Sequence, residues 1–321
     1  MQLGERASAA APRLRQPVNF VLDPLVILSG LVVGFVVGLT GMGGGALMTP
    51  ILVLLFGVEP LTAVSSDVVA AMVMKPIGGV VHWRRGTVHT GLVKWLVLGS
   101  VPSAFLGVFI LRRLDPGAAL QAHIKTAVGV ALLLVTAGLA GKPLLKARRS
   151  EHDDSGPVVP KRLATLAVGI VGGLVVGLTS VGSGSLMGVS LLLLYPRLRL
   201  SELVGTDLVQ AIPLVASAAL GHLLFGSFKL GLTVSILIGS LPGVFIGARC
   251  SARAPDRVIR SALAVVLFLT GLKLLNAPNL GLAIAAPVAV AVGVAAAIWP
   301  SLRWSARRDP ALSEESGKAV S

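Results

Sequence analysis

Residues 36 to 48 read VVGLTGMGGGALM, and residues 175 to 187 read VVGLTSVGSGSLM. Nine of the thirteen positions are identical, and each segment lies within a long apolar block. Internal similarity of this kind predicts a chain built from two copies of one structural unit. After the quoted segments the register continues with one inserted residue, which pairs Asp67 with Asp207 and His82 with His222.

Composition places the duplicated chain in a membrane. Hydrophobic residues make up 54% of the 321 residues and charged residues only 13%, with a mean hydropathy of +0.87, whereas soluble domains carry roughly 25% charged residues. The apolar blocks, each near or above the roughly 20 residues that cross a bilayer, span 25–57, 62–82, 92–112, 122–141, 162–195, 202–224, 231–248, 256–275 and 280–299. We therefore expect an all-α, polytopic membrane protein with eight or nine transmembrane helices and a glycine-broken first helix in each repeat.

The blocks and the duplication define the expected domain organisation. Its parts are a polar N-terminal segment (1–24), a first transmembrane repeat (25–141), a hydrophilic linker (142–161), a second transmembrane repeat (162–275), an extra helix (280–299) and a polar tail (300–321).

Charge and motif content exclude several functions. The net charge is +14, but the basic residues sit mostly in short loops, where they anchor at lipid headgroups. Aromatic residues are only 4% of the chain and are not interleaved with the basic ones, which argues against nucleic-acid binding. Cys250 is the single cysteine. Metal-ligand spacings, nucleophile triads, P-loops and dinucleotide fingerprints are missing from the sequence, so we expect neither an enzyme nor a cofactor or metal.

The glycines of the first and fifth blocks are dense enough to break a helix. A break at membrane depth leaves N–H groups that only protein, water or a ligand can satisfy. A half-helix starting near Ala46 or Ser185 would direct a positive dipole end at one point, which favours an anion. The alternative is that the glycines only allow close helix packing. The candidate substrate-binding residues here are Thr40, Gly41, Gly43, Gly44, Gly45, Thr179, Gly182, Ser183, Gly184 and Ser185.

Lys75 is a further candidate for substrate binding. It lies inside AAMVMKPIGGVV and shares one helical face with Asp67 and His82. We expect it to face a cavity in the protein rather than to extend to the lipid headgroups. Its equivalent in the second half is near Val215, so the two halves are not functionally identical.

Two matching pairs of ionisable residues have a structural and a functional interpretation. Asp67 and Asp207 follow Ser66 and Thr206, a pattern typical of helix N-caps or first-turn carboxylates. The functional alternative is an acid that carries a coupling proton or holds a substrate-binding loop. His82 and His222 occupy matching helix ends, as interfacial end caps or as proton switches.

The distribution of basic residues leaves the membrane topology open. If residues 25–57 cross once, the N-terminus and the linker lie on one side and are cytoplasmic. In that scheme Arg249 and Arg253 fall on the wrong side. If each broken block is a hairpin, each half has five segments and the repeats are inverted.

The chain resembles the TauE/SafE sulfite exporter family, also called the TSUP family of membrane transporters. The resemblance covers roughly residues 28 to 275 and rests on GLTGMGGGALMTPIL and GLTSVGSGSLMGVSL, the following SSD and GTD, and the later GSVPSAFLG and GSLPGVFIG. It implies export or uptake of sulfite, sulfonates and related small sulfur-containing anions, without nucleotide hydrolysis.

These observations favour a secondary transporter that binds a small anion at the interface of two repeats. Its expected location is a bacterial inner (cytoplasmic) membrane, with the lipid bilayer, the anion and a coupling proton or ion as partners and no nucleic acid. A passive anion channel is the alternative function, and a membrane scaffold without transport is a third.

Overall fold

The computed structural model describes residues 22–40, 44–113, 117–149, 160–184, 186–195, 198, 200–250, 256–278 and 287, and these are helical with short connections. The ten helices in the described part are α1 (Pro24–Thr40), α2 (Gly45–Leu54), α3 (Pro60–Arg84), α4 (Thr90–Arg113), α5 (Ala118–Arg149), α6 (Arg162–Thr179), α7 (Leu186–Leu194), α8 (Leu200–Phe225), α9 (Leu230–Cys250) and α10 (Asp256–Leu274). The chain is therefore an all-α, polytopic membrane protein, as predicted.

The apolar blocks predict the helices well. Among the described residues, six helices are long and apolar enough to cross a membrane, and α1, α2 and the Ser261–Leu274 part of α10 are shorter apolar helices. The predicted extra helix at 280–299 lies outside the described residues, apart from residue 287. Helix α5 continues to Arg149 and so takes up residues 142–149 of the predicted linker.

Both predicted glycine breaks are present. The first block divides between Thr40 and Gly45, and the fifth divides between Thr179 and Leu186. In the second break the backbone turns sharply, with a φ of 61° at Ser180 and 107° at Gly182. Glycine adopts such a positive φ without a steric penalty, whereas serine does so rarely.

The broken blocks are hairpins rather than single crossings. In the second, Met187 near the start of α7 lies against Gly172 of α6, while the Tyr195 hydroxyl after α7 contacts Thr165 near the start of α6. Helices α6 and α7 therefore run in opposite directions. In the first, α2 begins beside Val37 of α1 and runs back along α3, from Met74 towards Asp67.

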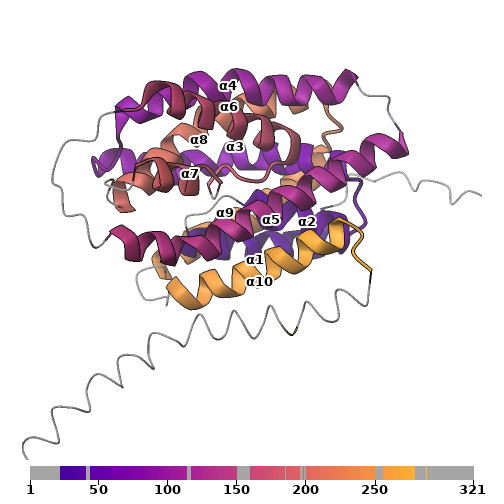
Figure 1. Cartoon of the computed structure of the whole chain (residues 1–321). Coiled ribbons are helices and arrows are strands. Elements are labelled where there is room, and N and C mark those ends of the chain that lie inside the picture. The colour runs from indigo at the N-terminus through magenta and orange to yellow at the C-terminus, as the bar shows by residue number, and fades with distance from the viewer. Residues whose placement is uncertain are drawn as a thin grey trace, which may run out of the picture.

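Long helices of one half pack along helices of the other. Helix α1 lies along α9 and α4 lies along α6, and Figure 1 shows α4 and α6 side by side. Glycines bring the backbones together: a Cβ on Gly30 would lie 2.8 Å from Ile236 O, and one on Gly169 would lie 2.6 Å from Leu96 O. Small residues allow this close approach between apolar helices, which gain little hydrophobic free energy from pairing within lipid.

Equivalent helices of the two halves are antiparallel. Gly78 of α3 faces Leu208 of α8, whereas Thr87, beyond the end of α3, faces Gly205 near the start of α8. Helices α5 and α10 also run in opposite directions, because Lys125 near the start of α5 bonds Asn276 after α10. Antiparallel pairing of equivalent helices is the geometry of inverted halves, one of the two topologies left open by the sequence.

The hairpins change the expected sidedness. The backbone N–H of Asp23, just before α1, donates to Ser235 near the start of α9 (3.3 Å). The backbone N–H of Lys229, just before α9, donates to Ser66 near the start of α3 (3.3 Å). The start of α1 therefore lies at the side where α3 begins, whereas α5 ends at the opposite side. The placement of N-terminus and linker on one side, which required residues 25–57 to cross once, therefore does not apply, and the hairpin alternative does.

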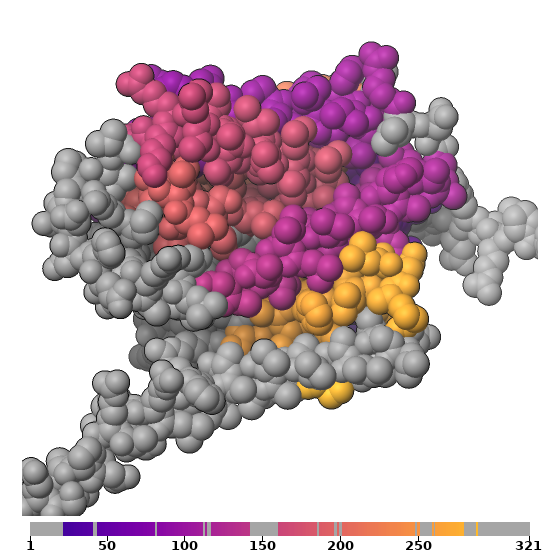
Figure 2. All heavy atoms as spheres, viewed as in Figure 1, coloured from indigo at the N-terminus to yellow at the C-terminus, as the bar shows by residue number. Residues whose placement is uncertain are grey.

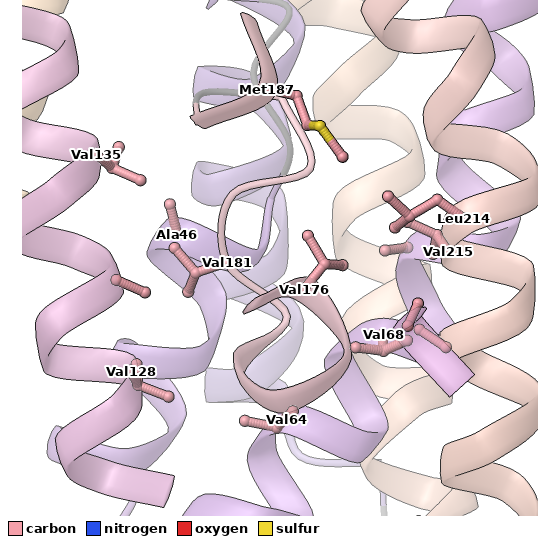
Figure 3. Packing of buried hydrophobic residues seen from close by; sticks show 14 of the residues in the cluster. Ala46, Val64, Val68, Val128, Val135, Val176, Val181, Met187, Leu214 and Val215 are labelled. Atoms are coloured by element: carbon pink, nitrogen blue, oxygen red, sulfur yellow. The ribbon is translucent and has the colours of Figure 1, made fainter. Parts of the chain in front are cut away.

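The outer and inner faces of the bundle are both apolar, as lipid requires. Helix α5 crosses the face shown in Figure 2 between α10 and the α6–α7 hairpin. It exposes Val130 and Leu134, and α10 exposes Val266, each close to half of its surface. Inside, the α6–α7 connection lies between α5 and α8, with Val181 beside Ala46 (Figure 3).

We expect Gly169→Ala to destabilise the bundle, because the new Cβ would lie 2.6 Å from a backbone oxygen of α4 and force α4 and α6 apart. Overpacking of this kind costs about 1–3 kcal/mol. Thermal unfolding in detergent measures the effect. The matched control is Gly141→Ala, where nothing lies within 4 Å of the added Cβ. Equal stability of both variants would contradict the close-packing role.

Candidate functional site

The two broken segments meet inside the bundle. Gly45, the first residue of α2, lies directly against the backbone of Ser180, so that even a methyl group would not fit there. The side chain of Lys75 on α3 donates from Nζ to the carbonyl oxygen of Ser183 in the second break (3.4 Å). The breaks, although far apart in sequence, thus form one polar region at the interface of the two halves.

Asp67 on α3 joins the two halves at this region. Its Oδ2 accepts hydrogen bonds from Thr49 Oγ1 of α2 and from Ser180 Oγ of the second break, both at 2.8 Å. The side chain is fully buried. Hydrogen bonds to a carboxylate are stronger than those between neutral groups, so this clamp fixes both broken segments against α3.

Lys75 is buried in the same region. Only 6% of the residue is exposed, and among the described residues it is the single Lys or Arg that is buried. The carboxylates that act electrostatically on it are Asp207 and Asp67. The ammonium group therefore points into the protein and not to the lipid headgroups.

Asp207 has different neighbours from its counterpart. Its Oδ1 accepts a hydrogen bond from Gln210 Nε2 (3.1 Å). A Cβ added at Gly188 would lie 3.4 Å from Oδ2. Gly188 is the equivalent of Thr49, so the second half has no hydroxyl at this position.

Asp67 and Asp207 are not helix N-caps. Helices α3 and α8 begin seven residues earlier, at Pro60 and Leu200, so both carboxylates lie within their helices. Proline is favoured in the first turn of a helix, because it lacks only an N–H that would be unpaired there. Pro60 therefore marks the start of α3, whereas the Ser65-Ser66-Asp67 pattern led to a predicted start seven residues too late.

The two histidines are not equivalent. His222 is fully buried, with Nδ1 2.9 Å from Ser65 Oγ and Nε2 2.8 Å from Gly177 O, so it links α8 to α3 and α6. His222 lies in the last turn of α8, as predicted, but it is buried rather than interfacial. His82 lies in the last turn of α3, where Nδ1 is 3.0 Å from Thr87 Oγ1, away from the contacts of Asp67 and Lys75.

The remaining predicted residues divide into three sets. Thr40 and Thr179 donate to carbonyl oxygens of their own helices, at 2.8 and 2.6 Å, so their protons are already used. Gly44, Gly45, Gly182, Ser183 and Gly184 line the breaks. Gly41, Gly43 and Ser185 lie outside the described residues.

Sequence reasoning missed three polar partners in the site. They are Thr49, Ser180 and Gln210. Thr49 could have been found as a hydroxyl residue within an otherwise apolar half-helix. The equivalent residue, Gly188, has no hydroxyl, and this would have indicated that the two halves differ here. Among the described residues no group of three or more His, Cys, Asp and Glu side chains could hold a metal ion.

A multi-pass helical bundle with broken helices and a buried charge at its centre is the architecture of membrane transporters. The chain matches the sulfite exporter TauE/SafE family over residues 26–274, and it belongs to that family.

Its relatives carry transporter names. It is 40% identical over 255 residues to "Probable membrane transporter protein YjnA" of Bacillus subtilis (strain 168), across 78% of this chain and 98% of the relative. It is 26% identical over 257 residues to "Probable membrane transporter protein YdhB" of the same strain, across 78% of this chain and 99% of the relative. A "Probable membrane transporter protein" of Xylella fastidiosa (strain Temecula1 / ATCC 700964) is 26% identical over 231 residues, across 71% of this chain and 85% of the relative. No solved structure matches the chain.

We expect Ser180→Ala to destabilise the protein by about 1–3 kcal/mol, since the buried carboxylate loses one of its two hydrogen-bond donors. Thr49→Val should have an effect of the same size. Thermal unfolding in detergent tests this, with Thr270→Val as the control, because the Thr270 hydroxyl bonds only its own helix at an exposed position. Wild-type stability of Ser180→Ala would show that the clamp contributes nothing.

Proposed function

We propose that the protein is a secondary transporter of small anions, with sulfite or organosulfonate-type sulfur compounds as its cargo. The anion binds between the two breaks, beside Lys75. The substrate class is supported by membership of the sulfite exporter family, and the site is supported by the geometry. Transport moves the anion through the bilayer without a chemical step, so no enzymatic role is assigned to any residue.

The buried ammonium of Lys75 is the observation that carries this proposal. A charge at membrane depth is costly and marks substrate or ion pathways. Lys75 lies next to the second break, where it donates to a backbone carbonyl at 3.4 Å. That long hydrogen bond leaves the other ammonium protons available for an incoming anion.

The starts of the two short helices add a second source of positive potential. Helix α2 begins at Gly45 and α7 begins at Leu186, both within the polar region. The first N–H groups of a helix have no partners within it and carry a partial positive charge. Such helix starts within a membrane bind anionic groups in secondary transporters.

Inverted halves supply a route to alternating access. We propose that the two halves are inverted repeats and that rocking one against the other opens the site to each side in turn. The antiparallel packing of α3 against α8 and of α5 against α10 supports this relation.

Uptake of labelled sulfite, sulfate and methanesulfonate into proteoliposomes tests the proposed function. We expect saturable uptake of at least one of the three and accelerated exchange when the same anion is inside. Flux that does not saturate and shows no exchange would favour the passive channel. No flux of any of them would contradict the proposed substrate class.

The orientation follows from the positions of the basic residues. At the side where α3 ends lie the ends of α5 and α9 and the start of α6. These helix ends and the adjacent linker carry Arg84, Arg85, Lys142, Lys146, Arg148, Arg149, Lys161, Arg162 and Arg249. Cytoplasmic loops are enriched in Lys and Arg. We propose that this side of the protein faces the cytoplasm and that the protein lies in a bacterial inner membrane. Arg249, which lies on the wrong side in the single-crossing scheme, is then cytoplasmic.

The single cysteine provides a direct test of this orientation. Cys250 is exposed at the end of α9. We expect a membrane-impermeant maleimide to label it only after the cells are permeabilised. In a Cys250→Ser background, Lys229→Cys at the start of α9 should be labelled in intact cells. The reverse pattern would invert the proposed orientation.

Replacing Lys75 tests its role in anion binding. We expect Lys75→Met to raise the half-saturation concentration about five- to thirty-fold, the equivalent of roughly 1–2 kcal/mol, with a larger loss for a divalent than for a monovalent anion. Lys75→Arg keeps the charge with a different donor geometry, so we expect a smaller rise in the half-saturation concentration. The control is Lys94→Met, since Lys94 is exposed on α4. Unchanged affinity in Lys75→Met would remove Lys75 from the site.

A further inference from the structure

Asp67 has one oxygen that the clamp does not use. Both hydroxyl donors, from Thr49 and Ser180, go to Oδ2. Oδ1 is buried and has no hydrogen-bond partner among the described residues. An ionised carboxylate buried with one oxygen lacking any donor is costly, and a carboxylic acid needs an acceptor for its proton at that oxygen. In either state Oδ1 lacks one partner.

The charges around this oxygen do not favour an anion as they stand. Lys75 contributes one positive charge, whereas Asp67 and Asp207 contribute two negative charges when ionised. An anion arriving beside three such groups would be repelled more than attracted. Protonating one carboxylate removes one negative charge and leaves a balanced pair, so that binding of an anion and of a proton favour each other.

We propose that Asp67 Oδ1 is the site where a coupling proton is carried, and that the protein moves one proton together with each anion. The proton binds Oδ1 from the water on one side, donates a hydrogen bond to an oxygen of the anion in transit, and is released to water on the other side. This inference rests on the proposed function, because it needs an anion beside Lys75.

The groups that face Asp67 are few. Lys75, two turns away on the same helix, acts electrostatically on Asp67, and Asp207 of α8 acts in turn on Lys75. His222 of α8 contacts Ser65 and Gly177 instead. Helices α2 and α7 carry no titratable side chain. The ionisable residues of α9 are Arg249 and Cys250 at its far end, and on α5 His123 is exposed.

Asp67 is a better proton site than Asp207, although the two are equivalent in sequence. Asp207 Oδ1 already accepts a hydrogen bond from Gln210 at 3.1 Å. In Asp67 the two donors on Oδ2 hold the carboxyl group in one orientation and leave Oδ1 as the atom that gains or loses the proton. The Thr49 and Ser180 positions are glycines in the other half, Gly188 and Gly41.

Asp67→Asn distinguishes proton transport from anion transport, because its amide mimics a permanently protonated carboxyl group. The probe is labelled methanesulfonate, which stays ionised across the assay range, with sulfate as a second probe. With methanesulfonate, one proton per anion gives about tenfold accumulation for a gradient of one pH unit. We expect wild-type protein to approach this ratio and to acidify the lumen as the anion enters. Asp67→Asn should still exchange labelled for unlabelled anion but should accumulate none.

Asp207→Asn is the matched variant, and it should still move protons with the anion even if its affinity changes. Loss of proton movement in Asp207→Asn, with retention in Asp67→Asn, would overturn the assignment. Two further results would overturn the assignment while leaving the proposed function intact. One is anion exchange by wild-type protein without any proton movement. The other is accumulation that requires Na⁺ in place of a pH gradient. Failure of wild-type protein to exchange either anion would contradict the proposed function itself.

Discussion

The structure depends on how backbone groups are satisfied where two helices break inside an apolar bundle. Water is scarce there, so each break needs polar partners from the protein or a ligand. For the second break the partners come from the opposite half: Ser180 bonds Asp67, a carboxylate that also holds Thr49 of α2 in its own half. Because Asp67 and Lys75 of the first half bond the second break, neither half presents a complete polar region alone. The site is therefore a consequence of how the halves are held together.

Close backbone contact makes this arrangement possible. Helix pairs α1 with α9 and α4 with α6 approach through glycines, since apolar side chains would gain nothing by leaving lipid for one another. The glycines thus have two roles that the sequence does not separate. At Gly169 and Gly30 they permit packing, whereas at Gly182 the positive φ requires one. Within the glycine segments themselves the close-packing interpretation holds at Gly45 and Gly177, which lie directly against backbone atoms of Ser180 and Ala104, whereas anion binding by these segments stays a prediction.

The sequence could predict features that depend on local composition, but not those that depend on the direction in which the chain continues after a break. Block lengths locate most of the helices, glycine density locates both breaks, and the isolated charge identifies Lys75. The direction of the chain after each break follows from long-range contacts such as Tyr195 with Thr165, which leave no periodic signal. The clamp was missed for the same reason, because Ser180 and Asp67 are 113 residues apart. Asp67 itself was misplaced by a local cap pattern that the proline at position 60 overrides.

The two halves differ in several polar groups at the site, although nine of thirteen positions in their break segments are identical. Asp67 and Asp207 are conserved between the copies, but Thr49 corresponds to Gly188, Ser180 to Gly41, and Lys75 to the neighbourhood of Val215. A fully symmetric interface would place two cations and two clamps about the axis, and two buried ammonium groups would repel each other strongly in a low dielectric. With one cation and two carboxylates, protonation of a single carboxylate leaves the three groups without net charge. In the proposed transport cycle the two halves open the site to both sides alike, while the first half supplies Asp67, Thr49 and Lys75.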